Sequence, residues 1–422
     1  MTNVIDILRA RGLLDDLTSP EAHRAVESPV TVYAGFDPSS DSLQAGNVVT
    51  IMALAHFQRC GHRVVALVGG ATGMIGDPSG KSSERSLLSA EQVERNVPGI
   101  RENLSRFLDF DDPAAPATIV NNHDWLGRFT FIEFLRAVGK HFRMGAMLGK
   151  ESVRARLNSE AGMSFTEFSY QLLQAYDFLH LYDERGCTVQ IGGSDQWGNI
   201  TAGIDLIRKL RNAEAYGVTM PLVCDSAGQK FGKSEGNAVY LDRRKTSCYS
   251  FYQFFVRTAD ADAVRFLKIF TFLPLEEIAE LEKLTLAAPE KRAAQKKLAE
   301  EVTRAVHGAA GLQEAQRASA ALFGESMEGL QAGELLEVFA DVASTELPRD
   351  QVERASVVDL AAACGLCKSK SDARRLVEKG GLYLNNRRVA GLDTAVTAPD
   401  LIDGRLLVLR SGKKTFHLVK VV

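Results

Sequence analysis

The chain has 422 residues, 45% hydrophobic and 24% charged, which predicts more than one domain and the composition of a soluble globular protein. Its net charge of -3 is unevenly divided. Residues 355–422 hold 12 Lys and Arg against 6 Asp and Glu, and the rest of the chain holds 38 Lys and Arg against 47 Asp and Glu. The basic C-terminal part predicts a polyanionic partner. The lack of a long apolar run or a signal-peptide pattern argues against membrane-spanning and secreted proteins, so we expect a cytoplasmic location.

The first predicted unit that carries chemistry is a strand, a polar turn and a helix. An amphipathic helical stretch, residues 2–26, precedes it, and the β-branched and aromatic residues of Val30–Phe36 predict the strand. Apolar spacing in the next helix places Gly46 and Asn47 in or near its first turn, where free N–H groups favour an anion. Gly35 and Gly46 have no side chain at two points where a ligand would approach the backbone. Open α/β sheets bind their ligands at such strand ends.

A second strand, Arg63–Val68, completes a βαβ pattern and leads into a glycine-rich loop, Gly69–Lys81. The loop matches neither a Walker loop nor a dinucleotide fingerprint. Simple flexibility explains its glycines but not the neighbouring Asp77 and Lys81, which predict contact with a ligand. Arg85 is placed either to follow phosphates or to lie on the surface.

A helix is predicted to begin at the capping pattern of residues 164–167. Along it, Tyr170, Gln174 and Asp177 follow at i, i+4 and i+7 and share one face. Asp177 lies between aromatic residues and needs a partner if that face is buried, since an unpaired buried charge is costly. The alternative is that the face is solvated.

Two further loops carry candidate ligand-binding groups. The short strand Thr188–Ile191 ends in Gly192–Gln196, where Asp195 provides a carboxylate for ribose hydroxyls. Lys230 and Lys233 lie three residues apart in a polar loop and predict a cradle for a triphosphate, although such a pentapeptide is also common as a surface charge run.

The C-terminal part reads as helices followed by a small mixed domain. A helix is predicted over 289–306, a linker over 326–354, and then helices around 357–364 and 371–379 with a strand at 405–409. A basic cluster on or before the last helix is a phosphate-tracking pattern: Lys368, Lys370, Arg374, Arg375 and Lys379.

The six cysteines are scattered as in a reduced intracellular protein. Cys364 and Cys367 form a C-x-x-C, which is compatible with a redox pair or half a zinc site. No second ligand pair lies nearby in the sequence, so we interpret both as small helix residues and expect no resident metal.

Two segments resemble the signatures of class I aminoacyl-tRNA synthetases. DSLQAGN at 41–47 is similar to the HIGH signature, and KFGKS at 230–234 is similar to KMSKS. The flanking sequences YAGFDPSSDSL, GGATGMIGDPSGK, SYQLLQAYDF and QIGGSDQWGNI resemble bacterial-type tyrosyl-tRNA synthetases, and the likeness runs to the last residues. There is one departure, because Gln44 stands where the family has its first His; Asn47, at the second His, is a commoner variant.

The resemblance implies an α/β fold with a Rossmann-like parallel sheet. It implies a catalytic domain at 1–245, an α-helical anticodon-side domain at 246–325 and, after the linker at 326–354, a ribosomal-protein-type RNA-binding domain at 355–422. It also implies a homodimer, formed through an insertion within 91–147. The aromatic-rich helix at 129–142 is core or interface.

The resemblance further implies activation of tyrosine by magnesium-bound ATP, followed by transfer of tyrosine to tRNA. The implied tyrosine-binding residues are Tyr33, Asp77, Tyr170, Gln174, Asp177, Gln190 and Gln196. Of these, Tyr33 and Asp177 are implied to bind the phenolic hydroxyl. The implied ATP and adenylate residues are Gly35, Asp37, Ser39, Gly46, Gly193, Asp195 and Lys233. The implied catalytic residues are Gln44, Asn47, Lys81, Lys230, Lys233 and Ser234.

Three alternatives stay open at this point. Activation of tryptophan is the nearest, but Tyr33 and Asp177 match the tyrosine pattern. A small-molecule nucleotidyltransferase shares the first signature but not the basic tail. A catalytically weakened, synthetase-like RNA-binding protein is supported only by Gln44.

Overall fold

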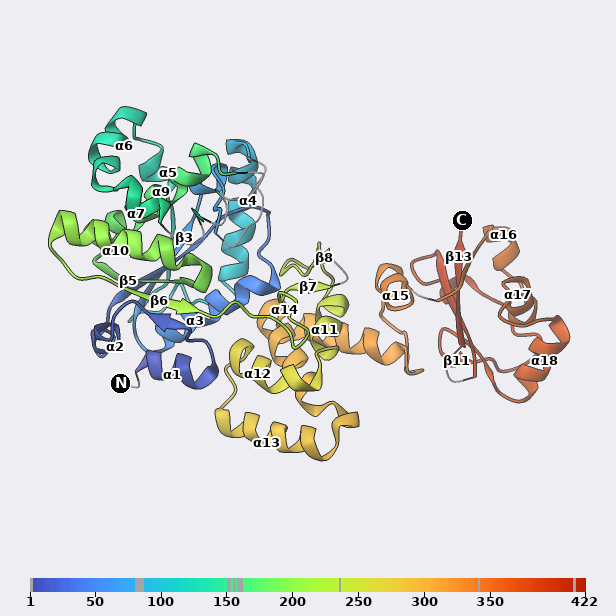
Figure 1. Ribbon diagram of the computed structural model, residues 1–422. Coiled ribbons are helices and arrows are strands. Elements are labelled where there is room, and N and C mark those ends of the chain that lie inside the picture. The colour runs from blue at the N-terminus through green and yellow to red at the C-terminus, as the bar shows by residue number, and fades with distance from the viewer. Residues whose placement is uncertain are drawn as a thin grey trace. The chain divides into compact units, whose positions relative to one another are not determined.

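The computed structural model describes residues 3–79, 87–149, 153–154, 157, 162–234, 237–340, 342–412 and 415–422. It contains two compact units, which Figure 1 shows in the colours of the chain. The first comprises Met1–Thr246 and Phe255–Val306, and the second comprises Ser247–Phe254 and His307–Val422. The chain therefore enters the second unit for residues 247–254 before it completes the first. Among the described residues, every helix falls short of the length or apolarity needed to cross a bilayer.

The first unit is built on a six-stranded sheet with the order β1-β6-β5-β2-β3-β4. Its strands are β1 (Asp16–Leu17), β2 (Thr31–Phe36), β3 (Arg63–Val68), β4 (Thr118–Asn121), β5 (Cys187–Gly193) and β6 (Tyr216–Met220). Neighbouring strands are parallel, except that β1 is antiparallel to β6. The predicted α/β parallel sheet is confirmed.

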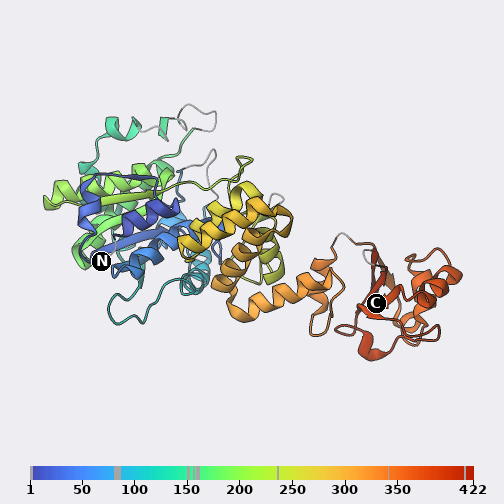
Figure 2. The ribbon, with the colours of Figure 1, turned by 90° about the horizontal axis from the view of Figure 1, so that it is seen from below.

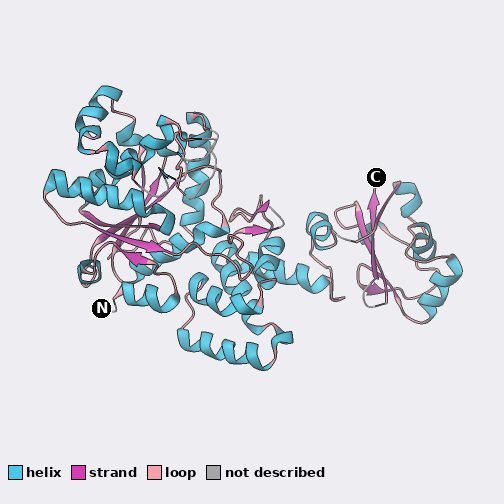
Figure 3. Ribbon diagram, in the orientation of Figure 1, coloured by secondary structure: helices cyan, strands magenta, loops and turns pink. Residues whose placement is uncertain are grey.

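Helices cover this sheet, as Figure 3 shows. They include α1 (Val4–Arg11), α2 (Glu21–Ala25), α3 (Val48–Arg59), α4 (Ala90–Leu104), α5 (His123–Leu126), α6 (Phe131–Ala137), α7 (Met144–Leu148), α9 (Phe165–Arg185) and α10 (Trp197–Arg211). Tyr33, Val65 and Leu67 face a core that includes Phe178 of α9 and Leu206 of α10. Because successive strand residues alternate between faces, the intervening residues of β2 and β3 face the other side, where α3 packs.

The strand order reverses between β2 and β5. From β2 the chain moves outward through α3 to β3, and from β5 it moves the other way through α10 to β6. In open parallel sheets, such a reversal leaves a crevice at the carboxyl ends of the two strands, and ligands bind there. Residues 37–47 and 193–199 follow these two ends.

Most of the predicted elements of this unit are confirmed. Strand β3 has the predicted bounds, and β2 differs from its prediction by one residue. Helix α9 follows the predicted N-cap, with the Ser164 hydroxyl accepting from the Glu167 N–H at 3.2 Å. The single helical stretch predicted over 2–26 is wrong: Gly12, in a left-handed conformation, ends α1, and β1 then pairs with β6.

The unit also contains a hairpin and several helices after the sheet. The hairpin consists of β7 (Lys233–Ser234) and β8 (Asn237–Ala238). The helices are α12 (Asp260–Phe270), α13 (Leu275–Ala287) and the first part of α14 (Ala293–Ala321), whose helical geometry is interrupted at Gly308. Helix α11 (Cys248–Val256) belongs to the second unit except for its last two residues. Arg11 fastens α1 to the end of α12 by donating to the carbonyl oxygens of Thr271 at 2.8 Å and Leu273 at 2.7 Å.

The second unit contains a five-stranded sheet with the order β11-β10-β12-β13-β9. Its strands are β9 (Ser344–Leu347), β10 (Leu382–Leu384), β11 (Arg387–Arg388), β12 (Leu406–Ser411) and β13 (Thr415–Val421), and its remaining helices are α15 (Ala332–Val338), α16 (Arg349–Val352), α17 (Val357–Ala363) and α18 (Lys370–Glu378). Figures 1 and 2 show α17 and α18 on one side of this sheet and α15 on the other. Leu407 and Leu409 belong to the core under α17 and α18, and Leu406 and Val408 to the core under α15.

Residues 326–354, which we expected to form a linker, contain α15, β9 and α16. Strand β9 pairs in parallel with β13, so this stretch is part of the second sheet. Gly329 precedes α15, Gly333 lies within it, and Pro348 separates β9 from α16, so these residues do not mark an unstructured connection. Cys364 caps α17 and Cys367 lies in the turn beyond it, so Cys367 is not the helix residue that we expected; both are buried and unpaired.

Candidate active site

Asp177 of α9 is a buried carboxylate with two hydrogen-bond donors. Only 2% of the residue is exposed. Its oxygens accept from Trp125 Nε1 at 2.7 Å and from Asn122 Nδ2 at 3.0 Å. Burial raises its pKa to about 7, although both donors act in the opposite direction. Two hydrogen bonds leave lone pairs on this carboxylate for a further donor.

Two unpaired polar atoms lie on the strands beside this carboxylate. The Tyr33 hydroxyl of β2 and the Gln190 Oε1 atom of β5 are buried and have no hydrogen-bond partner among the described residues. Tyr33 and Gln190 are register partners in the sheet. Burial raises the pKa of Tyr33 well above its usual value, and the charge of Asp177 adds to the effect. A buried polar group without a partner is unfavourable, so these atoms are suited to a ligand with matching polar groups.

A chain of hydrogen bonds connects this pocket to the end of β2. Asn122 also donates to Thr72 Oγ1 at 3.0 Å, and Thr72 donates to Asp37 Oδ1 at 2.8 Å. The Tyr170 hydroxyl donates to the second oxygen of Asp37 at 2.8 Å. The residues that follow β2, β3 and β4 are thus joined to α9 in one network.

A second polar group surrounds Asp77. Gln196 donates to Asp77 Oδ2 at 2.6 Å, and Gln174 donates to Gln196 Oε1 at 3.2 Å. Asn199 Nδ2 lies 3.0 Å from Gln174 Oε1 and 3.4 Å from Asp77 Oδ1. Asp77 is 8% exposed. This group presents amide and carboxylate oxygens that suit a cationic ligand.

The two signature segments are in backbone contact. Ala45 N–H donates to the carbonyl oxygen of Val239, and Leu241 N–H donates to that of Leu43. A Cβ atom added at Gly46 would lie 3.3 Å from the Phe231 carbonyl oxygen. Gly232 has a φ of +94°, and a Cβ atom there would lie 2.8 Å from the Gly46 nitrogen. Side chains are therefore excluded where the segments meet.

The N-terminus of α3 lies beside this contact. Gln44 is half-buried, and its N–H donates to Asn47 Oδ1 at 2.9 Å. Asn47 itself is exposed at the end of a short 3₁₀ turn, Ala45–Asn47, that leads into α3. Lys230 is also exposed. Gln44, Asn47 and Lys230 therefore lie next to the contact between Gly46 and Phe231–Gly232. Lys230 is at least 183 residues away from the other two in the sequence.

The structure describes some of the other predicted site residues but not all of them. Gly35 and Ser39 are exposed, and Gly193, the last residue of β5, and Asp195, which follows it, are partly buried. Lys81 and Arg85 lie outside the described residues, as do the side chains of Lys233 and Ser234.

The predicted basic cluster lies in the second unit. All five side chains are exposed: Lys368, Lys370, Arg374, Arg375 and Lys379. Lys370 pairs with Asp359 at 2.7 Å, and Arg375 pairs with Asp372.

Sequence reasoning missed the residues that support the pocket. Asn122 and Trp125 follow the short strand β4, Thr72 follows β3, and Asn199 lies in the first turn of α10. Each is polar and follows a strand end of a parallel sheet. That position was the signal available in the sequence.

Comparison with known proteins agrees with this geometry. The sequence profile described as tRNA synthetases class I (W and Y) matches residues 25–324, and that of the tyrosine–tRNA ligase SYY-like C-terminal domain matches residues 334–419. The chain is 50% identical to the tyrosine–tRNA ligase of Roseiflexus castenholzii over 100% of both chains, and 51% identical to that of Protochlamydia amoebophila, again over 100% of both. A C-terminally truncated mitochondrial tyrosyl-tRNA synthetase of Aspergillus nidulans has a TM-score of 0.68 at 32% identity, covering 75% of this chain and 92% of that one.

The chain belongs to the class I tRNA synthetases of the tryptophan and tyrosine family. Within that family it is similar along its whole length to the tyrosine–tRNA ligases.

We expect Trp125→Phe to destabilise the protein more at pH 8 than at pH 5. The raised pKa of Asp177 means that its neutral form is favoured in the fold, so its contribution to stability falls as pH rises from the ordinary value of 3.8 to about 7. Above that range the carboxylate is ionised and depends most on the Trp125 N–H. A hydrogen bond to a charged group contributes about 1.5 to 3 kcal/mol, and one to a neutral group about 0.5 to 1.5 kcal/mol. Urea unfolding at both pH values measures the difference.

Trp197→Phe is the matched control, since this half-buried tryptophan lies at the start of α10. It removes the same ring without removing a donor to Asp177. Equal losses at the two pH values for Trp125→Phe would contradict the assigned role of its N–H.

Proposed function

We propose that the protein is a tyrosine–tRNA ligase that works in two steps. In the first, the carboxylate of L-tyrosine attacks the α-phosphorus of magnesium-bound ATP, and tyrosyl-adenylate forms with release of pyrophosphate. In the second, a hydroxyl of the terminal ribose of tRNA attacks the tyrosyl carbonyl and AMP leaves. This proposal is supported by relatives that are 50% and 51% identical over the whole chain and are tyrosine–tRNA ligases. ATP is a substrate of the reaction that they catalyse.

The observation that supports tyrosine most directly is the pocket of Asp177 and Tyr33. Asp177 has two donors and remaining lone pairs, and the Tyr33 hydroxyl is buried without a partner among the described residues. A phenolic hydroxyl donates to the carboxylate and accepts from Tyr33, which satisfies both groups. Gln190, beside Tyr33 in the sheet, completes the lining of this end.

The other end of the amino acid is assigned to the group around Asp77. Gln174 and Gln196 present oxygen atoms beside the buried carboxylate of Asp77, and the Tyr170 hydroxyl lies at Asp37. The tyrosine ammonium donates to such acceptors. Binding at both ends orients the tyrosine carboxylate toward ATP. For a displacement at phosphorus, orientation and charge stabilisation supply most of the catalysis.

ATP is assigned to the crevice between β2 and β5. The adenylate is bound by Gly35, Asp37, Ser39, Gly46, Gly193 and Asp195. Gln44 and Asn47 donate to phosphate oxygens at the start of α3, where free backbone N–H groups add to the effect. Lys81, Lys230, Lys233 and Ser234 stabilise the charge that develops on pyrophosphate as it leaves.

The second unit is assigned to tRNA. The exposed basic side chains on and before α18 form a phosphate-binding surface with no base-specific pattern of its own. These residues are Lys368, Lys370, Arg374, Arg375 and Lys379. Residues 355–422, together with β9, would then hold the nucleic acid while the first unit activates tyrosine. All six cysteines are thiols, which suits a reducing cytoplasm, the location that we assign.

A homodimer is assigned to the surface around α6. Phe131, Ile132 and Leu135 of α6 are exposed, as are Met144 of α7 and Phe165 at the start of α9. Large apolar side chains gathered in this way mark protein–protein contacts. We expect sedimentation equilibrium to give a dimer, and Ile132→Glu to give a monomer with unchanged helical content. A wild-type monomer at micromolar concentration would refute this assignment.

We expect exchange of labelled pyrophosphate into ATP with tyrosine, and not with phenylalanine or tryptophan, in the absence of tRNA.

Asp177→Ala should lose the selectivity for tyrosine over phenylalanine. A site that hydrogen-bonds a hydroxyl rejects an analogue lacking it more strongly than an apolar pocket rejects a missing methylene, and tyrosyl-tRNA synthetases are a standard example of this contrast. Asp177→Asn keeps the shape and an acceptor for Trp125, and serves as the second variant if the alanine variant unfolds.

Competition between the amino acids separates the possible failures. Selectivity retained in both Asp177 variants would remove this residue from the hydroxyl site while leaving the ligase activity in place. Absence of exchange from folded wild-type protein that binds tRNA would indicate an RNA-binding relative without activation.

Replacing Gln44 by the histidine of the family is expected to change the exchange rate by about tenfold or less. Gln44 donates to phosphate as a neutral amide, and one neutral hydrogen bond is worth about 0.5 to 1.5 kcal/mol. The measurement is kcat of exchange at saturating tyrosine and ATP, with Gln44→Ala as the variant that has no donor. A gain of several decades in Gln44→His would mean that glutamine disables the site.

A further inference from the structure

One face of α4 lies along the loop that leads from β2 to the first signature. Asn96, Gly99 and Asn103 are spaced at i, i+3 and i+7 and share this face. Asn96 Nδ2 donates to the Pro38 carbonyl oxygen at 2.8 Å. A Cβ atom at Gly99 would lie only 1.7 Å from the Asp41 carbonyl oxygen, so helix and loop backbones touch there. The loop is thus held along its length by a helix outside the site described above.

Asn103 makes the most deeply buried of these contacts. It is 7% exposed, and its Oδ1 atom accepts from the Leu43 N–H at 2.8 Å and from the Ser42 hydroxyl at 3.1 Å. Ser42 and Leu43 are 3% and 4% exposed. No water can replace the amide oxygen readily at such a site, so removing it leaves the Leu43 N–H without an acceptor.

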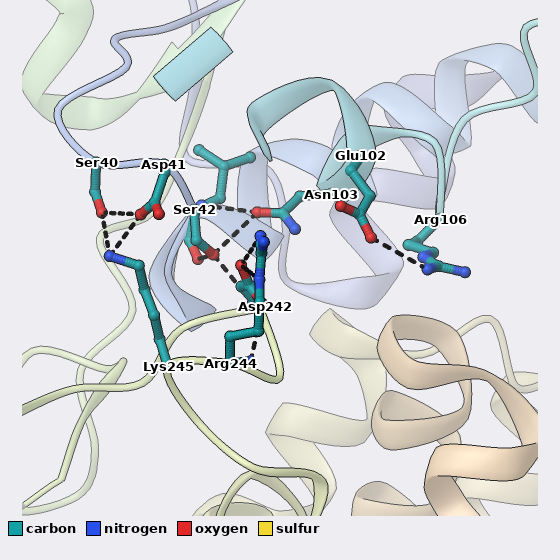
Figure 4. Close-up of polar contacts among 10 residues, drawn as sticks. Ser40, Asp41, Ser42, Glu102, Asn103, Arg106, Asp242, Arg244 and Lys245 are labelled. Atoms are coloured by element: carbon teal, nitrogen blue, oxygen red, sulfur yellow. Dashed lines mark hydrogen bonds and ion pairs between the residues drawn. The ribbon is translucent and has the colours of Figure 1, made fainter. Parts of the chain in front are cut away.

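The same two residues also bind the segment that follows the second signature. Ser42 Oγ accepts from the Asp242 N–H at 3.0 Å, and the Leu43 carbonyl oxygen accepts from the Leu241 N–H at 2.9 Å. Figure 4 shows Ser42 joined by dashed lines to both Asn103 and Asp242. Residues 42–43 are therefore bound from both sides, by α4 and by the chain that leaves the β7–β8 hairpin.

The ion pairs around this cluster each have a solvent-exposed partner. Lys245 lies 2.5 Å from Asp41, with side chains 33% and 46% exposed, and Arg244, whose side chain is 72% exposed, pairs with Asp242, whose side chain is 9% exposed. Solvent-exposed pairs of this kind contribute little to stability. The buried acceptor of Asn103 is the contact that fixes the backbone.

We propose that Asn103 is a positioning residue for tyrosine activation. Its amide oxygen sets the backbone of Ser42 and Leu43, and so the place of Gln44, Gly46 and Asn47 against residues 231–232 and 239–241. This inference rests on the proposed function, because it assigns the positioning to the ATP side of that reaction. Asn103 touches neither substrate and acts through the backbone of the first signature.

The test is tyrosine-dependent pyrophosphate exchange by the full chain, normalised to folded protein at 25 °C. Asn103→Leu has the branching of asparagine in a larger side chain and has no acceptor, and Asn103→Asp keeps an oxygen in the same place. We expect kcat to fall about tenfold in Asn103→Leu, with KM for tyrosine within about twofold of wild type, because the tyrosine pocket is built mainly on α9 and the end of β5. Asn103→Asp should recover most of the lost kcat.

Glu102→Ala is the matched control on the same helix. Glu102 is 61% exposed and pairs with Arg106 at 3.5 Å on the outer face, as Figure 4 shows. Its exchange kinetics should equal those of wild type.

Each outcome separates the inference from the function on which it rests. Wild-type kcat in Asn103→Leu, or equal losses in the leucine and aspartate variants, would overturn the positioning role while wild-type exchange upholds the ligase. A loss confined to KM for tyrosine would also overturn it. If wild type and Glu102→Ala both fail to exchange with tyrosine, the proposed function fails and this inference fails with it.

Discussion

The burial of one carboxylate constrains the catalytic unit more than any other feature. Removing Asp177 from water costs several kcal/mol unless donors replace the lost hydration. Trp125 and Asn122 supply those donors, and Asn122 reaches Thr72, which reaches Asp37. The ends of β2, β3 and β4 are consequently tied to α9 around a single charge. The contacts that make this charge tolerable are also those that shape the pocket, so the stability of the fold and the shape of the pocket depend on the same atoms.

The meeting of the two signatures depends on backbone atoms. Gly46 and Gly232 bring the two chains together at a distance that a side chain would prevent, and the N–H groups of Ala45 and Leu241 bind across the contact. Because these contacts involve backbone atoms, the side chain at position 44 can change without moving the backbone of either segment. A substitution at the first histidine of the family is therefore compatible with an intact site geometry.

Local sequence patterns predicted the parts of the fold that local forces stabilise. The Ser164 cap located the start of α9, and helical spacing correctly put Tyr170, Gln174 and Asp177 on one face. The same patterns could not reveal that Asp177 binds Trp125 and Asn122, which lie 52 and 55 residues away in the sequence. Strand β1 has two residues and exists because it pairs with β6, whose Thr219 lies opposite Asp16. Strand β9 likewise depends on β13. Pairings between distant segments leave no periodic signal in either one, so the residues at 2–26 and 326–354 were misjudged.

The passage of the chain through the second unit at residues 247–254 bears on how the protein is made. Tyr249 shares a hydrophobic core with Ala318, Phe339 and Leu418, the last of which lies in the final strand. On the ribosome, Tyr249 emerges before these partners, and at usual rates of synthesis it precedes Leu418, the most distant of them, by on the order of ten to thirty seconds. The first unit is complete once residues up to Val306 are synthesised, and at that point the core residues of the second unit that pack with Tyr249 have not yet been made. Residues 247–254, which include the aromatic residues Tyr249, Phe251, Tyr252 and Phe254, are therefore synthesised with the first unit, although they pack with the second.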